Sequence, residues 1–219
     1  SQDPSYSGIA PGAQVLAIKA FSSTGTATTA DVISGISKCL EKASAYNIKV
    51  FSFSFGGNIY SGACDTDSLA SVANELVEMG FFVAAASGNT GDSTKINSPA
   101  CGSNVTAVGA VYDSSSSVPD TIPSFSNANS LLDILAPGVN ICTTTIKTAG
   151  SGSCSGKTSS TTSGETIIEG NNKYGSFSGT SLSAPLVAGA AALVAQYKKE
   201  EANTVLDPTT IASYLTTYG

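Results

Sequence analysis

Histidine and tryptophan are absent from the sequence, and methionine occurs once in 219 residues. Charged residues are scarce as well, at 12%, and the formal net charge is -6. Nucleic-acid binding needs clustered Lys and Arg, so this balance argues against a nucleic acid as partner. The lack of histidine is the more consequential absence, because histidine is the commonest general base in enzymes.

Long apolar runs are also lacking. No run approaches the roughly 20 residues that a membrane helix needs, so no membrane contact is predicted. The longest run, residues 184–195, contains Pro185 with several Ala and Gly and is typical of a buried helix. The first residues, SQDPSYSG, show neither the basic nor the apolar region of a signal peptide. With 41% hydrophobic residues, the chain suits a single compact domain across residues 1–219.

Five cysteines are present, at positions 39, 64, 101, 142 and 154. Their spacing fits no zinc site, and no metal site is predicted. The high content of Ser, Thr, Gly and Ala, with few charges, resembles that of secreted enzymes. Two disulfides with one leftover thiol is therefore the favoured interpretation, and five reduced, buried thiols is the alternative.

Hydrophobic patterning predicts strands and helices in alternation. Apolar strands are expected at residues 14–21, 49–55, 81–86 and 104–111, and helices at residues 30–45 and 67–80. Thr28 or Thr29 is expected to cap the first helix, and Asp67 to open the second. This order predicts an α/β fold that has a mostly parallel sheet with helices on both faces.

Shorter elements follow in the second half of the chain. Strand-like pieces lie at residues 132–135 and 139–146, and a stretch rich in Ser, Thr and Gly at 148–163 predicts an exposed loop. A hairpin strand is expected to start at Ile167 and to return near Tyr174. One helix should follow Ser181, and another should begin at Asp207, an N-cap residue followed by proline.

Three short motifs carry chemical information. Gly179-Thr180-Ser181 precedes an apolar helix, where free N–H groups favour negative charge, although a simple helix cap is an equal alternative. Asn89 follows an apolar strand, where its amide could stabilise an oxyanion. Gly56-Gly57 ends another strand, where two glycines could let a peptide approach. Taken singly, a structural turn is the favoured interpretation of the last two motifs.

Taken together, these motifs resemble those of the subtilisin-like serine proteases. The matching segments, in sequence order, are APGAQVLAIKAF, FSFGG, VAAASGN, VTAVGAV, SFSN, DILAPG and GTSLSAPLVAGAAALV. They extend over nearly the whole chain from about Gly8, and the GTS-x-x-x-P segment is highly specific. The resemblance implies the three-layer subtilisin-like fold and the activity of a serine-type endopeptidase.

The resemblance also implies roles for individual residues. Ser181 would be the nucleophile, and Asn89 together with the Ser181 backbone N–H would stabilise the oxyanion. Ala86, Ser87 and Gly88 would line the pocket for the residue before the cleaved bond, whose small, uncharged walls favour an apolar or aromatic side chain over a charged one. The full set of expected substrate-binding residues is Ser54, Phe55, Gly56, Gly57, Ala86, Ser87, Gly88 and Thr180.

Two members of the family's catalytic triad have no counterpart in this sequence. The family's aspartate and histidine motifs precede the region that the chain matches, and Asp3 and Asp31 do not stand in the aspartate motif. The chain is therefore expected to be the C-terminal portion of such a protease, without the N-terminal part of the fold, and nearly inactive alone. Its expected partners are a segment that carries the Asp and His, a polypeptide substrate and a propeptide.

Two alternatives stay open. A histidine-less pseudoprotease would keep the peptide groove and act as a binding or interaction protein. A carboxyl-type serine protease of the sedolisin kind would use a Glu base, and such enzymes also carry a Gly-Thr-Ser-x-Ser-Ala-Pro motif, which the segment GTSLSAP matches. Those enzymes, however, have Asp at the oxyanion position, where this chain has Asn89.

The family resemblance also implies a pairing for four cysteines. Cys64 would bridge to Cys101 and Cys142 to Cys154, while Cys39 would be a buried thiol or pair with a cysteine of the other segment. A secreted, extracellular protein is implied as well. No cofactor is expected for catalysis. Family members often bind structural calcium, but this sequence shows no dense Asp/Glu cluster for it.

Overall fold

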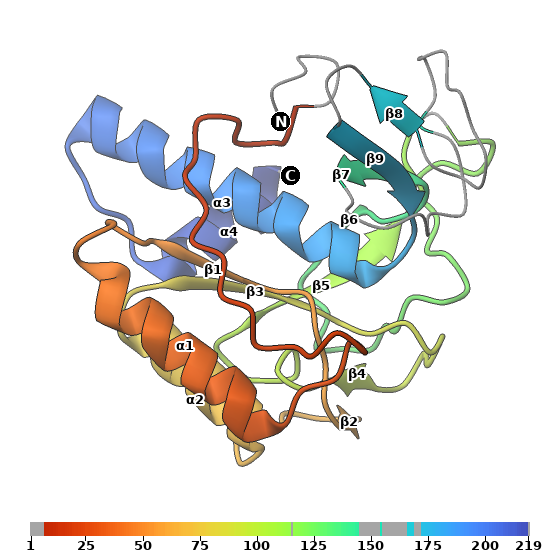
Figure 1. Ribbon diagram of the computed structural model, residues 1–219, viewed down its shortest axis with the longest axis horizontal. Coiled ribbons are helices and arrows are strands. Elements are labelled where there is room, and N and C mark those ends of the chain that lie inside the picture. The colour runs from red at the N-terminus through yellow and green to blue at the C-terminus, as the bar shows by residue number, and fades with distance from the viewer. Residues whose placement is uncertain (1–6, 115, 145–153, 155–165, 169–171, 219) are drawn as a thin grey trace.

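The computed structural model describes residues 7–114, 116–144, 154, 166–168 and 172–218. Its centre is a parallel sheet (Figure 1). Every residue of the strand Phe82–Ala86 is buried, as expected for a parallel strand that has neighbours on both sides. The strands lie in the order β1 (Val50–Phe53), β3 (Phe82–Ala86), β5 (Thr106–Val111) and β6 (Ile134–Pro137).

Helices cover both faces of this sheet (Figure 1). One face carries α1 (Thr29–Ala43) and α2 (Ser68–Glu78), and the other carries α3 (Thr180–Ala202) and α4 (Pro208–Tyr218). Successive side chains of β3 alternate between the two apolar layers, so that Val83 packs with α1 and α2. The predicted α/β architecture, a mostly parallel sheet between two helical layers, is confirmed.

Capping residues begin the helices where the sequence predicts. At α1, the Thr28 hydroxyl accepts from the Asp31 N–H, and the Asp31 carboxylate accepts from the Thr28 N–H. Asp67 caps α2 by accepting from two N–H groups of its first turn. Asp207 accepts from the Thr210 N–H at the start of α4. Each cap satisfies N–H groups that a helix cannot pair internally.

The strand predicted at residues 14–21 is not formed, and this prediction was wrong. The segment runs without pairing to β1, and Val15 is 87% exposed. An apolar strand pattern is not sufficient, because a strand also needs a partner for its backbone N–H and C=O groups. β1 is therefore an edge strand of the sheet. A cavity of about 2080 Å³ lies between β1 and this segment.

Two smaller antiparallel sheets lie beside the main one. The first pairs two short strands that the sequence did not predict, β2 (Ile59–Tyr60) and β4 (Ile96–Asn97). The second has the order β7 (Ile141–Thr144), β9 (Asn172–Phe177) and β8 (Thr166–Ile168), which confirms the predicted hairpin. The loop predicted at residues 148–163 lies outside the described residues, apart from Cys154.

Both expected disulfides are present, joining Cys64 to Cys101 and Cys142 to Cys154. The first ties the loop before α2 to the loop before β5. Cys39 is a free thiol in α1, and its partial burial raises the thiol pKa. No helix in the described part of the chain has the length and hydropathy to cross a bilayer.

Candidate active site

Two loops and one helix end meet at the carboxyl edge of the sheet. Because β1 and β3 are adjacent and parallel, the loops that follow them, residues 54–57 and 87–89, leave the sheet at the same edge. The helix α3 begins there too, with Gly179 as its N-cap. In open α/β sheets, ligands bind at this edge. Hydrogen bonds connect both loops to α3, so the predicted catalytic residues are brought together.

Ser181 is held by the loop that follows β1. Its hydroxyl donates to the Ser54 carbonyl at 3.2 Å, and the Ser54 hydroxyl donates to the Ser181 carbonyl at 2.8 Å. The second bond has room to form because Pro185, four residues later, has no N–H to occupy that carbonyl. The first turn of α3 also directs its free N–H groups and the positive end of its dipole toward this region.

Asn89 is oriented by Thr180. Its Oδ1 accepts from the Thr180 N–H at 2.8 Å and from the Thr180 hydroxyl at 3.0 Å. Thr180 is fully buried, and its hydroxyl accepts in turn from the Gly88 N–H at 3.2 Å. With Oδ1 turned toward α3, the Nδ2 donor of Asn89 has no partner among the described residues. An unengaged amide donor at this place can stabilise a developing oxyanion.

Several expected substrate-binding residues offer only their backbone. The Phe55 ring packs against Phe53 in the core, with ring centroids 5.1 Å apart. Ser87 is fully buried, and its hydroxyl donates to the Asn127 carbonyl at 2.8 Å. The Gly57 N–H donates to the Ser98 carbonyl at 2.8 Å. These contacts fix the two loops and leave small backbone surfaces toward the site.

Asn97 and Asn127, which the sequence alone does not mark as site residues, hold the loops around the site in place. The fully buried Asn127 accepts at Oδ1 from the N–H groups of Thr90 (2.9 Å) and Asp92 (3.1 Å), which fixes the loop that carries Asn89. Its Nδ2 donates to Oδ1 of Asn97 at 3.2 Å. Asn127 ends the SFSN segment, which is the only signal in the sequence that could have pointed to it. Asn97 stands in no motif.

The base that would activate Ser181 is not found in the described part of the chain. The hydrogen bonds of the Ser181 hydroxyl and carbonyl go to Ser54, and neither a lysine nor a carboxylate contacts them there. Nor do the described residues contain a group of three or more His, Cys, Asp or Glu that could hold a metal ion. Structural calcium therefore stays a prediction from the family resemblance, as does catalysis without a cofactor.

Comparison with known proteins gives matches over most of the chain. The Subtilase family model matches residues 1–217. Subtilisin E of Bacillus subtilis (strain 168) is 37% identical over 190 residues, which cover 85% of this chain and 40% of that protein. Serine protease AprX of the same strain is 33% identical over 213 residues, which cover 90% of this chain and 45% of that protein.

A solved structure agrees with these matches. The crystal structure of a cold adapted subtilisin-like serine proteinase superposes with a TM-score of 0.60 at 26% identity, covering 90% of this chain and 57% of that one. The sheet, its two helical layers and the structural match place the protein in the class of α/β folds of the subtilisin-like kind. The chain belongs to the subtilase family, as its motifs indicate. It spans 40–45% of the length of the two relatives described above.

Proposed function

We propose that this chain is the serine-bearing part of a subtilisin-like endopeptidase that cleaves polypeptides through an acyl-enzyme on Ser181. The observation that carries the proposal is the convergence of Ser181, Asn89 and Ser54 at the start of α3. The Ser181 Oγ attacks the peptide carbonyl carbon and gives its proton to a base. The oxyanion accepts from Asn89 Nδ2 and the Ser181 N–H, the amine leaves with that proton, and water then hydrolyses the acyl-enzyme.

The base comes from a segment outside these 219 residues, which contain no histidine. A serine hydroxyl is a weak nucleophile without a base, and here it donates to a carbonyl oxygen instead. The chain alone is therefore expected to be nearly inactive, with only oxyanion stabilisation and binding left to act. The segment that supplies His would also supply the Asp that orients it.

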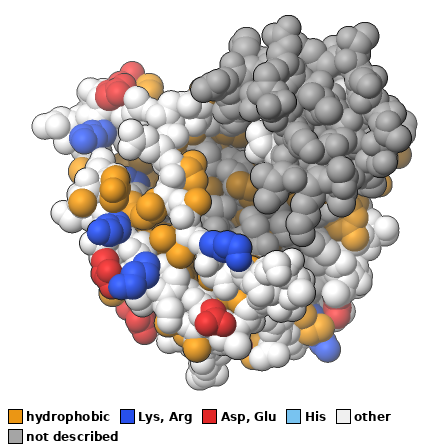
Figure 2. All heavy atoms as spheres, in the orientation of Figure 1, with side chains coloured by type: hydrophobic (Ala, Val, Ile, Leu, Met, Phe, Trp, Pro, Cys, Tyr) orange, Lys and Arg blue, Asp and Glu red, His pale blue; other side chains and the backbone are white. Residues whose placement is uncertain are grey.

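The cavity beside β1 supports the docking of such a segment. Its volume of about 2080 Å³ is larger than the roughly 300–1,000 Å³ of small-molecule pockets, so a polypeptide suits it better. Among the described residues, β1 pairs with β3 alone, and an added strand can use its other edge for main-chain hydrogen bonds. Figure 2 shows hydrophobic side chains on this face, with charged side chains scattered among them.

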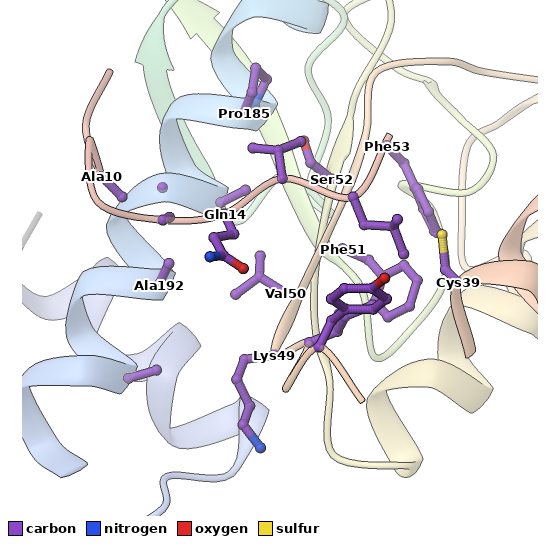
Figure 3. A pocket seen from close by; sticks show the side chains of 18 of the residues that line it. Ala10, Gln14, Cys39, Lys49, Val50, Phe51, Ser52, Phe53, Pro185 and Ala192 are labelled. Atoms are coloured by element: carbon purple, nitrogen blue, oxygen red, sulfur yellow. The ribbon is translucent and has the colours of Figure 1, made fainter. Parts of the chain in front are cut away.

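One end of the cavity reaches the candidate active site. Its lining runs from Lys199 and Asn203 near the end of α3 to Ser54 and Pro185 beside Ser181. Figure 3 shows the side chains that face the cavity, from residues 10 and 14 of the N-terminal segment, from β1 and from α3. A segment seated along β1 can therefore place one of its ends next to the Ser181 hydroxyl.

A fluorophosphonate probe, which labels activated serines, tests the proposal. The chain alone should label weakly, and labelling should rise by at least about a hundredfold once the Asp- and His-bearing segment is added, since an activating base contributes about 10²–10⁴-fold. Ser181→Ala should abolish the labelling, whereas the exposed control Ser213→Ala should retain it. Labelling that persists in Ser181→Ala would refute Ser181 as the nucleophile.

The lack of histidine also favours a second candidate, a pseudoprotease that binds peptides at the same site without cleaving them. This candidate predicts no labelling of Ser181 with any added segment, together with measurable peptide binding. The sedolisin-like alternative is less well supported, since the residue at the oxyanion position, which accepts hydrogen bonds from Thr180, is Asn89 rather than an aspartic acid. It predicts labelling that depends on an added Glu rather than on His.

We also propose that the protein is secreted. Two disulfides are stable in an oxidising compartment and are rare in the cytosol. Mass mapping of the unreduced protein isolated from the culture medium and from cells would test this. The protein should occur in the medium, with Cys64 joined to Cys101. Cys39 should carry either a free thiol or a disulfide to the Asp- and His-bearing segment. A propeptide stays a prediction of the resemblance.

A further inference from the structure

The turn that leads into β5 carries the triplet Asn104-Val105-Thr106. It matches the acceptor pattern for N-linked glycans, Asn-x-Ser/Thr with a middle residue other than proline, and no other Asn in the sequence stands in this pattern. The pattern alone does not make a site, because a strand that began at residue 104, as the sequence predicts, would bury the amide. The structure has β5 begin at Thr106 and leaves Asn104 exposed in the preceding turn.

The side-chain amide of Asn104 is little used by the fold. Its Nδ2 lies 3.4 Å from the Glu78 Oε1, longer than the usual N–H···O distance, and both residues are exposed. Other groups fix the backbone here, since the Asn104 N–H donates to Oδ1 of the buried Asn74 at 3.0 Å. Asn74 donates in turn to Asp65 at 2.8 Å, and the Ser103 N–H donates to the same carboxylate. A sugar on Nδ2 leaves all of these bonds intact.

We propose that Asn104 is a glycosylation site and carries an N-linked oligosaccharide in the secreted protein. This inference rests on the proposed secretion and is independent of the proposed cleavage chemistry. The sugar donor is an oligosaccharide joined through its anomeric carbon to a lipid diphosphate, and a transferase of the secretory pathway catalyses the step.

The transfer exchanges one bond for another at the anomeric carbon. A bond forms between Asn104 Nδ2 and that carbon, and the bond from the carbon to the diphosphate oxygen breaks, so the lipid diphosphate leaves. Nδ2 gives up one proton and keeps the other, and no group is oxidised or reduced. The product is a neutral amide that bears a polar sugar on the protein surface.

The buried Thr106 determines when this transfer can occur. The acceptor pattern requires a hydroxyl on the third residue, so the transferase must reach that hydroxyl. In the folded protein Thr106 is 5% exposed, and β5 lies between β3 and β6. Thr106 is therefore accessible only while β5 is unpaired, and Asn104 is modified before the chain folds.

The glycan would lie away from the candidate active site. Parallel strands begin at one edge of a sheet and end at the other, and Asn104 precedes β5 whereas Asn89 follows β3. Asn104 also lies outside the lining of the cavity beside β1. Substrate binding and docking of the Asp- and His-bearing segment are therefore compatible with a modified Asn104.

The first test is mass mapping of the protein that its source organism releases into the medium. The peptide that contains Asn104 should carry a glycan, and a glycosidase that cleaves the bond from Nδ2 to the sugar by releasing the amide nitrogen should convert Asn104 to Asp. An unmodified Asn104 in a disulfide-bonded protein from the medium would overturn the inference alone. A protein found only inside cells, with reduced cysteines, would overturn secretion and the inference with it.

Variants of the full-length protein, secreted by a eukaryotic host, identify the acceptor. Asn104→Gln should lose the glycan completely, and so should Thr106→Val, which keeps the shape of the buried side chain and removes only the hydroxyl. Thr106→Ser should retain the glycan, as should the matched control Asn58→Gln, which changes an exposed asparagine outside the pattern. Because transfer precedes folding, the glycan is measured in total protein from cells and medium, so a variant that fails to fold still gives a result. A glycan that persists in Asn104→Gln or Thr106→Val would refute the assignment.

The timing has a test of its own. Full-length protein made in bacteria, without glycans, is offered either folded or reduced and unfolded to purified transferase with the lipid-linked donor. The unfolded chain should be modified at least about tenfold faster, since a central strand is exposed only by extensive unfolding. Equal rates for the two forms would refute the role of the buried Thr106, and modification of neither form would refute Asn104 as an acceptor.

Discussion

The buried hydroxyl of Thr180 offers the sharpest test of how the site is built. It donates to Asn89 Oδ1 at 3.0 Å and accepts from the Gly88 N–H at 3.2 Å, so it joins the loop after β3 to the start of α3. The substitution Thr180→Val keeps the shape of the side chain and removes both bonds. Because Thr180 is fully buried, water cannot easily replace the lost hydroxyl.

The magnitude follows from the two bonds taken separately. Asn89 Oδ1 keeps the Thr180 N–H at 2.8 Å, so losing the hydroxyl there costs about 0.5–1.5 kcal/mol. Gly88 loses the acceptor of its N–H, which costs about 1–3 kcal/mol for a group that water does not reach freely. The free energy of unfolding should therefore fall by about 1.5–4.5 kcal/mol, a large part of the roughly 5–15 kcal/mol of a typical protein.

Activity should fall as well, because Asn89 is then held by one bond instead of two. Removing an oxyanion donor outright costs about 10²–10³ in kcat, so we expect Thr180→Val to cost less, about tenfold. Urea unfolding and kcat/KM of the full-length protein measure the two effects. Thr180→Ser is the control, since it keeps the hydroxyl and loses only one methyl group. A Val variant within about 0.5 kcal/mol of wild type, or a Ser variant as damaged as Val, would refute the reasoning.

Three further predictions concern stability and assembly. Changing Cys64 and Cys101 together to Ala should cost about 4 kcal/mol, because their bridge closes a 37-residue separation, and an unchanged melting temperature would contradict this. Although burial opposes it, hydrogen bonds from Ser98, Tyr60 and the start of α2 hold the pKa of Asp67 below 3.8. The stability that this carboxylate contributes is complete above pH 3.8 and is lost as the pH falls through the lowered pKa. Asp67→Asn should therefore reduce the fall of the urea midpoint with decreasing pH, and an unchanged pH dependence would argue against this role of Asp67. Amides of residues 14–20 should exchange with deuterium rapidly in the chain alone and slowly once the Asp- and His-bearing segment binds, whereas equal rates would count against docking beside β1.

The sequence predicts elements well where their signals are local. The caps at Thr28, Asp67 and Asp207 satisfy N–H groups a few residues away, so their position could be inferred without knowing the fold. The continuous apolar run that forms β3 indicates a strand buried on both faces, and the structure has it between β1 and β5. Alternation of these strands with helices then predicts the parallel sheet.

The features that the sequence does not predict depend on contacts between distant segments. Residues 14–21 have a strand pattern, but whether they form one depends on a neighbouring strand, and no local pattern reports that. The strands β2 and β4 are two residues each, too short for a detectable period. Asn97 and Asn127 resemble ordinary loop residues, and only the fold brings their amides together.

The exchange of hydrogen bonds between Ser54 and Ser181 has a consequence for the order of folding. The two residues are 127 positions apart, and Pro185 leaves the Ser181 carbonyl without a donor from its own helix. A helix forms from local contacts within about a microsecond, whereas contacts between distant segments form slowly because a long loop must close first. The turn that carries Ser181 therefore completes its hydrogen bonds only when β1 and the loop after it are in place. A partly folded chain would contain the helix but not the completed hydrogen bonds of Ser181, so the proposed protease would position its serine only late in folding.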